Sequence, residues 1–542
     1  MRSYGVAGAW LAGIVAAFAA YLRLAQTRAV NSDGASQALQ AWDMLHGNPL
    51  LRGWTVSDVS FYTTELPQYA LVELIRGLRA DAVDVAAALT YTLVVLLAAL
   101  VAMGAATGRQ ALLRVAIAVG ILLAPQLGAG TNVLLSSPDH TGTSVPLLLT
   151  WLVIDRGGRR WYVPLITSLL LAWAEIADSI VLIAGIIPLV LVCAARAARA
   201  RSVRSVHSVR LGGGAAYELS MACGALAAAG AASLVLRAIA GAGGFAVRPL
   251  GIQIAPLREI FWHNPRVTAR CLLVLFGAST GGPSTGEATF FLVLHLAGVV
   301  LAAVGVAVAA RRIRRGGGDL ASQVLLAAIA VNLGAFLVTE RAVDAASARE
   351  IAPVLPFAAA LAARQLAPWL GSPRLVSQGL AGGALAVIGA GYVAGLGLEL
   401  TAPAAPPQGA PLAAWLESRH LEGAGLGGYW QASVVTLASG GTVAIRPVDD
   451  DDGEVSAHPG EVKDTWFDPG CSLAHFVVLS PGEPGYPGYA DDRAARATWG
   501  TPARVYHVGQ DTIWYWPKNL LTTIRAKPPS TTVGPCARQG KT

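Results

Sequence analysis

Charged side chains are scarce in this chain. Only 13% of its 542 residues are Asp, Glu, Lys or Arg, whereas 54% are hydrophobic, and an average soluble domain has about 25% charged residues. This shortage excludes a soluble multidomain protein. The apolar residues form repeated windows that are long enough to cross a bilayer. The sequence therefore predicts a polytopic α-helical membrane protein.

Cysteine is also rare. Three of the five cysteines, Cys193, Cys223 and Cys271, lie in or beside apolar windows, where a thiol is usually a plain core residue. Cys471 and Cys536 lie in the C-terminal tail and could form a disulfide in an oxidising exterior. No Cys and His spacing typical of zinc is present. A glycine-rich nucleotide motif is absent too, which disfavours a cytosolic nucleotide-sugar donor.

The apolar windows predict the membrane topology. We count about eleven of them. They lie near residues 5–25, 84–106, 113–130, 143–155, 162–177, 180–195, 215–238, 288–310, 320–338, 352–369 and 376–399. We interpret the first window as an uncleaved anchor, because its apolar run continues past the small residues that resemble a signal-peptidase site.

Arginines occupy alternate loops between these windows. They cluster at 109–114, 156–160, 196–210 and 311–315. This positive-inside pattern predicts a multi-pass plasma-membrane protein with a cytoplasmic N-terminus and an extracytoplasmic C-terminus. The net charge of +7 then reports orientation in the lipid bilayer, and we expect no nucleic-acid partner.

Two domains are expected. Residues 1–400 form the membrane domain, with a long first outer loop at 26–83, and residues 401–542 form an extracytoplasmic domain beyond a proline-rich linker. Short strand-like windows predict hairpins at 432–448 and 503–516. A helix at 411–422 would make this tail a small α+β module.

The segment NSDGASQALQAWDMLHGN (31–48) follows the first window directly. Its apolar residues recur at helical spacing, so it predicts an amphipathic helix with Asp33 near its start. Asp33 is then either a helix cap or a catalytic base held at the outer membrane surface. A full set of amide hydrogen bonds would weaken a base. If Asp33 is the base, we expect Ser32 to supply most of the capping.

Further ionisable residues are expected at the same face of the membrane. Each lies in an outer loop or at the outer end of a window: Asp58, Asp139, His140, Glu175, Asp178 and Arg349. Ionisable groups beside spans usually mark a polar cavity, although a single outer-loop charge can equally face water. Taken together, they are candidate substrate-binding residues. If Asp33 is the base, we expect it to face a cavity near His140, Glu175 and Arg349.

These residue types suit transfer of a sugar from a polyprenyl phosphate. The phosphate is already a good leaving group, so the reaction needs a carboxylate to take the proton of the acceptor hydroxyl and cations to stabilise the departing phosphate. Asp33 could be the base. Arg349, His140 or a bound divalent metal ion could supply the positive charge.

The segments SDGASQALQAWDMLHGNPLLRGW (32–54) and SFYTTELPQYALVELIRGL (60–78) resemble the first outer loop of the GT-C superfamily of integral membrane glycosyltransferases. The protein mannosyltransferase and aminoarabinose transferase branches are the most similar. The resemblance implies a polyprenyl-phosphate sugar donor, a cell-envelope acceptor and an aspartate base, at Asp33 in this sequence. Gly34 replaces the second acid of the common Asp-Glu pair, which leaves open whether Asp58 assists. Abundant Ala, Gly and Arg suggest a bacterial source.

Two other functions remain open on the sequence alone. A transporter or flippase of a lipid-linked glycan would often show internal repeats with broken helices, and we find no convincing repeat between the two halves. A non-catalytic envelope assembly protein would use its tail to bind polymer. The aromatic residues at 428–441 and 512–519 could stack on sugar rings, although aromatics in short strands are more often core residues.

Overall fold

The computed structural model describes residues 2–123, 129–202, 213–248, 251–279, 286–370, 375–421, 423–451, 453–479 and 491–524. Contacts divide the chain into two compact units. The first unit comprises Met1–Arg28, Ala87–Leu234 and Gly251–Ala404, and the second comprises Ala29–Ala86, Val235–Leu250 and Ala405–Thr542. Most of the predicted first outer loop therefore folds together with the C-terminal module.

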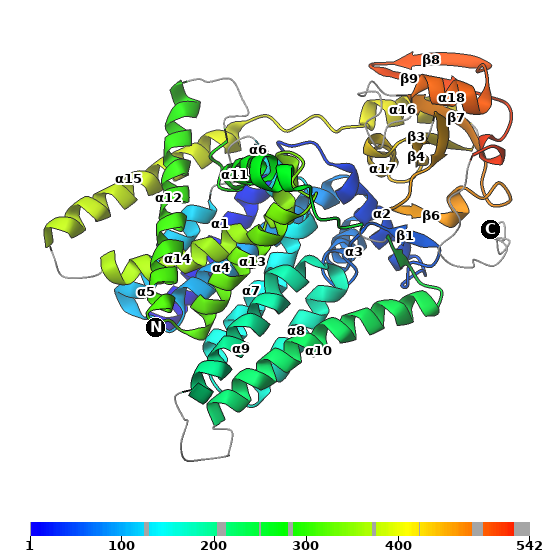
Figure 1. The fold of residues 1–542 in the computed structure, drawn as a ribbon. Helices are drawn as coiled ribbons and strands as arrows, with labels where there is room; N and C mark the ends of the chain where they lie inside the picture. Colours follow the sequence, from blue (N-terminus) through cyan, green and yellow to red (C-terminus); the bar gives the residue numbers. More distant parts are fainter. Residues whose placement is uncertain are drawn as a thin grey trace. The chain divides into compact units, whose positions relative to one another are not determined.

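The first unit is helical (Figure 1). It holds all or most of α1 (Arg2–Ala25), α4 (Asp81–Met103), α5 (Gly108–Leu122), α6 (Ala129–Leu135), α7 (Asp139–Gly157), α8 (Tyr162–Ala177), η2 (Leu182–Ile186), α9 (Ile187–Ser202), α10 (Gly213–Gly241), η3 (Glu259–His263), α11 (Asn264–Leu275), α12 (Gly286–Arg314), α13 (Leu320–Val338), η4 (Ala346–Ile351), α14 (Val354–Leu370) and α15 (Leu375–Thr401). Helices α7 and α8 run side by side, and α9 packs against α13.

Apolar helices occupy the predicted membrane windows. Within the described ranges, five helical stretches are long and apolar enough to cross a bilayer: Asp81–Met103, Leu182–Ala200, Gly214–Gly241, Thr289–Arg314 and Leu320–Val338. Shorter apolar helices lie at Trp10–Ala25, Tyr162–Ala177, Val354–Leu370 and Ala386–Thr401, and α5 and α7 occupy the other two windows. The helical membrane class is confirmed, and the number of spans stays a prediction.

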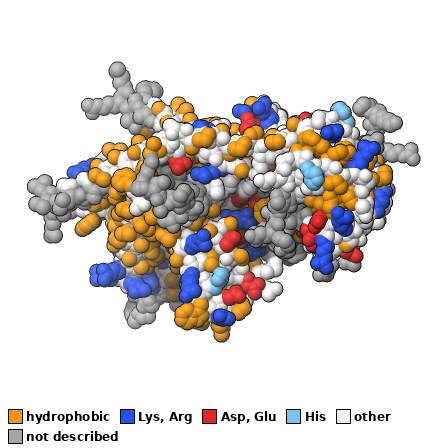
Figure 2. All heavy atoms as spheres, turned by 90° about the horizontal axis from the view of Figure 1, so that it is seen from above, with side chains coloured by type: hydrophobic (Ala, Val, Ile, Leu, Met, Phe, Trp, Pro, Cys, Tyr) orange, Lys and Arg blue, Asp and Glu red, His pale blue; other side chains and the backbone are white. Residues whose placement is uncertain are grey.

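The surface of these helices suits lipid. Leucines on four of them have more than half of their surface exposed: Leu11, Leu169, Leu191 and Leu234. Figure 2 shows hydrophobic side chains spread over the face that is in view. Helix α14, in contrast, exposes little surface: its residues from Val354 to Arg364 are all buried in the helical core. A helix that is apolar on all sides belongs inside a bundle.

The second unit contains two sheets and several helices. Its helices are α2 (Ser32–Leu45), α3 (Glu65–Arg76), α16 (Ala410–Arg419), α17 (Tyr429–Ala438), α18 (Asp492–Trp499) and the short η5 (Asp464–Trp466) and η6 (Leu520–Thr522). The smaller sheet has the order β2-β1-β6 and joins β1 (Trp54–Val56) to β2 (Ala246–Val247) and β6 (Val462–Lys463). This sheet connects three distant parts of the sequence.

The larger sheet has the order β5-β4-β3-β7-β9-β8. Its strands are β3 (Ala424–Gly428), β4 (Ile445–Asp451), β5 (Glu454–Ala457), β7 (Ala474–Leu479), β8 (Arg504–Val508) and β9 (Asp511–Tyr515). Central β3 runs parallel to β4 and β7. Glycine is needed in β3 because a Cβ at Gly425 would lie 2.3 Å from the Phe476 ring.

The tail is an α+β module, but one predicted hairpin is wrong. Residues 503–516 do form a hairpin, in which Val508 pairs with Asp511, and α16 occupies the predicted helix. The segment 432–448, in contrast, begins inside α17 and enters a strand only at Ile445. Its β-branched residues favour a strand locally, but packing of α17 against α2 overrides that preference.

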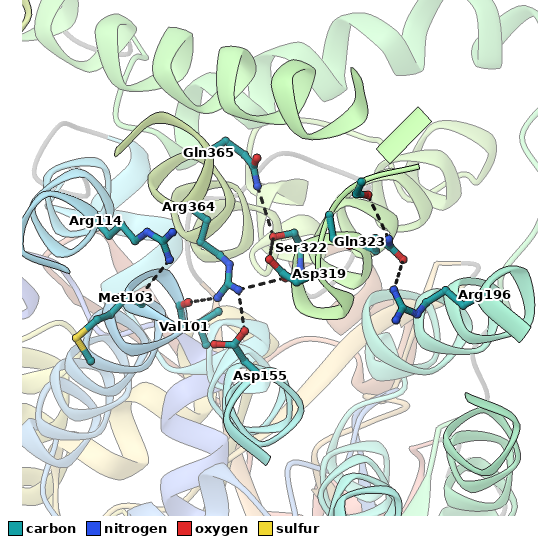
Figure 3. Close-up of polar contacts among 12 residues, drawn as sticks. Val101, Met103, Arg114, Asp155, Arg196, Asp319, Ser322, Gln323, Arg364 and Gln365 are labelled. Carbon is teal, nitrogen blue, oxygen red and sulfur yellow. Dashed lines mark hydrogen bonds and ion pairs between the residues drawn. The ribbon is translucent and has the colours of Figure 1, made fainter. Parts of the chain in front are cut away.

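A buried arginine links four helices of the first unit (Figure 3). Arg364 of α14 contacts Asp155 near the end of α7 at 2.7 Å and Asp319, the N-cap of α13, at 3.1 Å. It also donates to the Val101 carbonyl of α4 at 2.7 Å. Gly104 has a φ of +55° beside this cluster, and a Cβ there would lie 3.0 Å from the Arg364 guanidinium. The cluster therefore fixes the ends of α4, α7 and α13 on α14.

Arg364→Gln should destabilise the first unit strongly. The change leaves Asp155 buried without its cation, and breaking a buried ion pair in this way costs about 3–5 kcal/mol. Thermal unfolding of the purified protein in detergent measures the effect. Arg109→Gln removes an exposed arginine and serves as the control, because it should leave the melting temperature nearly unchanged. An equal melting temperature for both variants would contradict the role given to Arg364.

Candidate functional site

Helix α2 begins with an asparagine cap. The Asn31 side chain accepts a hydrogen bond of 2.8 Å from the Gly34 amide, which makes Asn31 the N-cap. The expectation that Ser32 supplies this cap is wrong, because the Ser32 hydroxyl donates to the Tyr429 carbonyl at 2.5 Å. Sequence reasoning passed over Asn31 although asparagine is among the best N-cap residues.

Asp33 meets a tyrosine from the C-terminal module. The Tyr429 hydroxyl donates to Oδ1 of Asp33, and the same hydroxyl hydrogen-bonds Oε2 of Glu461. Asp33 is half-buried, while Tyr429 and Glu461 are buried. All three residues belong to the second unit. A base candidate near the start of the chain is thus held by a residue 396 positions later.

The Tyr429 ring is itself fixed. It stacks on the His458 imidazole with 4.4 Å between ring centroids and an interplanar angle of 18°. His458 Nδ1 lies 2.9 Å from both carboxylate oxygens of Asp449. Burial, followed by the charges of Asp33 and Glu461, raises the pKa of Tyr429 well above its ordinary value. The phenol therefore keeps its proton at neutral pH and acts as a donor.

A second group of predicted residues forms in the first unit. His140, at the start of α7, places Nδ1 2.8 Å from Oδ2 of Asp178, which follows α8. Thr143 donates to the same oxygen, and the Ile180 amide donates to Oδ1 at 2.9 Å. Burial alone would raise the pKa of Asp178, but His140 and these donors outweigh burial and hold that pKa below its ordinary value.

The neighbourhood of this pair includes most other candidates. Arg349 of η4 and Glu350 both interact electrostatically with His140, and Glu175 interacts with Asp178. Asp139 precedes His140 and accepts a hydrogen bond of 2.5 Å from Ser137.

The structure thus brings Asp139, His140, Glu175, Asp178 and Arg349 into one cluster. Asp33 and Asp58 lie in the second unit, so the expected meeting of Asp33 with this cluster stays a prediction.

Sequence reasoning missed Tyr429, His458 and Glu461 as site residues. The segment that contains Tyr429 was singled out only for its aromatic residues, and nothing local connects it to Asp33. The other aromatic segment contains Trp514 and Trp516, which are buried in the core of the module. The predicted disulfide also stays a prediction, because Cys536 lies outside the described residues.

The carboxylates around Tyr429 are the nearest candidates for holding a metal ion beside Asp33. Asp33 and Glu461 converge on one hydroxyl, but among the described residues no group of three His, Cys, Asp or Glu side chains could hold a metal. The predicted divalent ion does not fit these residues as they stand.

Comparison with known proteins gives likenesses of structure. No family profile matches the chain, and no curated protein matches its sequence. An oligosaccharyltransferase of Archaeoglobus fulgidus, crystallised with zinc and sulfate, is similar with a TM-score of 0.49 and 13% identity, over 86% of this chain and 67% of that one.

A second likeness is to the arabinofuranosyltransferase AftD from Mycobacteria, with a TM-score of 0.40 and 15% identity. The similarity covers 93% of this chain and 41% of that one. Both of these proteins are glycosyltransferases.

Asp178→Asn should destabilise the first unit. It leaves the buried His140 without its counter-charge, at a cost of about 3–5 kcal/mol. Because the folded pKa of Asp178 lies below the unfolded value of about 3.9, the stabilisation is present above that pH and is lost as pH falls through the folded pKa. Thermal unfolding at neutral and strongly acidic pH checks this.

Glu259→Gln, at an exposed position, is the matched control and should melt like wild type at neutral pH. A deficit of Asp178→Asn that stayed constant down to strong acid would contradict the charge pairing with His140.

Proposed function

We propose that this protein is a membrane glycosyltransferase of GT-C type. It transfers a sugar from a polyprenyl-phosphate donor to a cell-envelope acceptor on the outer face of the plasma membrane, with Asp33 as the general base. The observation that carries the proposal is the fixed Asp33 carboxylate, because a separate residue, Asn31, caps α2 and Tyr429 holds Oδ1 of Asp33. A carboxylate that is half-buried and held in one orientation suits a base.

The reaction is a displacement at the anomeric carbon. The acceptor hydroxyl oxygen forms the new glycosidic bond while the bond from that carbon to the phosphate oxygen breaks. Asp33 takes the hydroxyl proton, and the electron pair of the broken bond leaves on polyprenyl phosphate. No general acid is required, because the phosphate is stable as an anion.

The cluster of the first unit is assigned to substrate binding. Arg349 and the His140 imidazole supply positive charge for the phosphate, and guanidinium and imidazolium groups both bind phosphate oxygens well. Asp139, Glu175 and Asp58 offer carboxyl groups to sugar or acceptor hydroxyls. Asp178 orients His140. The apolar helices accept the polyprenyl chain from the bilayer.

Asp33→Asn should abolish most of the transfer. Loss of a general base costs about 10²–10⁴-fold, because the amide cannot take the acceptor proton. A deletion strain complemented with wild type or variant, at matched membrane levels, is analysed for envelope glycans and lipid-linked sugars. The variant should leave a glycan residue missing and a sugar-loaded lipid in excess.

Asp492→Asn provides the matched control, since Asp492 is an exposed acid of the second unit. It should restore the glycan fully. Full restoration by Asp33→Asn would remove Asp33 as the base and would favour the transporter or assembly alternatives.

A further inference from the structure

The contact between Tyr429 and Asp33 is not needed to dock α17 on α2. Ala35, Ala38 and Ala41 of α2 form one apolar cluster with Val434 and Leu437 of α17. Burial of apolar surface of this kind stabilises the docked pair by about 25 cal/mol per Å². Docking of the two helices therefore does not explain why Asp33, Tyr429 and Glu461 form a polar cluster beside them.

A contribution to folding stability does not account for this polar cluster either. Two carboxyl groups, from Asp33 and Glu461, converge on the Tyr429 hydroxyl, and Tyr429 and Glu461 are buried. Removing ionised carboxylates from water costs several kcal/mol per ion, and well-packed apolar residues often serve as well or better. Arrangements of this kind are enriched at functional sites.

The backbone conformation of Glu461 also indicates a functional role for this cluster. Its φ is +55°, which is uncommon for a residue with a side chain and costs about 1–3 kcal/mol. Such strain persists where the surrounding structure imposes it, and it clusters at active sites. The residue with this strained backbone is the one whose carboxyl meets the Tyr429 hydroxyl.

The hydroxyl can donate only one proton. If Tyr429 donates to Asp33, its oxygen can accept from Glu461 when that carboxyl carries a proton. The chain of donors then runs from Glu461 through Tyr429 to Asp33. The stacked His458 fixes the plane of the phenol, so the Tyr429 oxygen is held in place between the two carboxyl groups.

We propose that Tyr429 is a positioning residue for the Asp33 base and that Glu461 positions the Tyr429 hydroxyl. The C-terminal module thus completes a catalytic site that the first loop only begins. This inference rests on the proposed function of Asp33. Holding Oδ1 fixes the side-chain rotamer of Asp33 and so the direction of its other oxygen. Misplacement of a catalytic group by about 1 Å can cost about 10²-fold.

Sugar transfer is measured with the full-length protein in lipid nanodiscs. The donor is the lipid-linked sugar that accumulates in the deletion strain, and the acceptor is the envelope fraction of that strain. Tyr429→Phe and Glu461→Gln should each lower kcat about ten- to hundredfold, with KM for both substrate preparations changed less than about twofold, because neither residue touches substrate. Introduced on top of Asp33→Asn, Tyr429→Phe should cause no further loss.

Matched controls remove the same groups elsewhere in the second unit. Tyr62→Phe deletes an exposed hydroxyl that donates to the Pro49 carbonyl, and Glu417→Gln changes an exposed acid. Both should keep wild-type kcat. Melting temperatures are measured for every variant, so that Glu461→Gln carries the test if Tyr429→Phe unfolds.

The outcomes separate the two proposals. Wild-type kcat in Tyr429→Phe and Glu461→Gln, with an inactive Asp33→Asn, overturns the positioning role and leaves the proposed base in place. An additional loss when Tyr429→Phe is combined with Asp33→Asn overturns it as well, since the tyrosine would then act independently of Asp33. An active Asp33→Asn overturns both proposals.

Discussion

The docking of α17 on α2 is the interaction on which the second unit depends. Small alanines on α2 allow the C-terminal helix to pack closely, and Val434 and Leu437 fill the contact. The smaller sheet repeats the same connection, because β1 of the first loop pairs with β6 of the tail. Nearby, Asp43 of α2 accepts from Lys463 at 3.1 Å and from Trp54 at 2.7 Å. The loop and the tail are therefore one folded body.

This organisation explains why a base at Asp33 can be well positioned. A long loop after a membrane helix would by itself leave the carboxylate mobile. Here the cap at Asn31, the contact from Ser32 to the Tyr429 carbonyl and the phenol at Oδ1 restrain the first turn of α2 at three points. Rigid elements hold functional groups more accurately than free loops do.

Buried charge serves the first unit in a related way. Arg364 joins helices that are far apart in the sequence, and the His140–Asp178 pair joins the start of α7 to the end of the next helix, α8. Apolar packing between membrane helices has little directional preference, whereas an ion pair that is removed from water must meet its partner. These clusters therefore specify which helix ends meet.

The sequence by itself determined the helical membrane class, because apolar windows and scarce charge admit few other solutions. It also indicated the amphipathic α2, the hairpin of β8 and β9, and the polar residues that gather around His140. Each of these features follows from the local spacing of apolar, polar and turn residues in the sequence. It predicted a strand where α17 forms, because β-branched residues favour a strand locally and the packing of α17 against α2 overrides that preference.

Only the tertiary structure decided that Tyr429, itself held by Glu461 and His458, meets Asp33. The contact between Tyr429 and Asp33 joins residues 396 positions apart, and a single sequence contains no local signal for such a pair. The physical reason is that long-range contacts follow from which apolar faces dock, and docking is set by the packing of the whole unit.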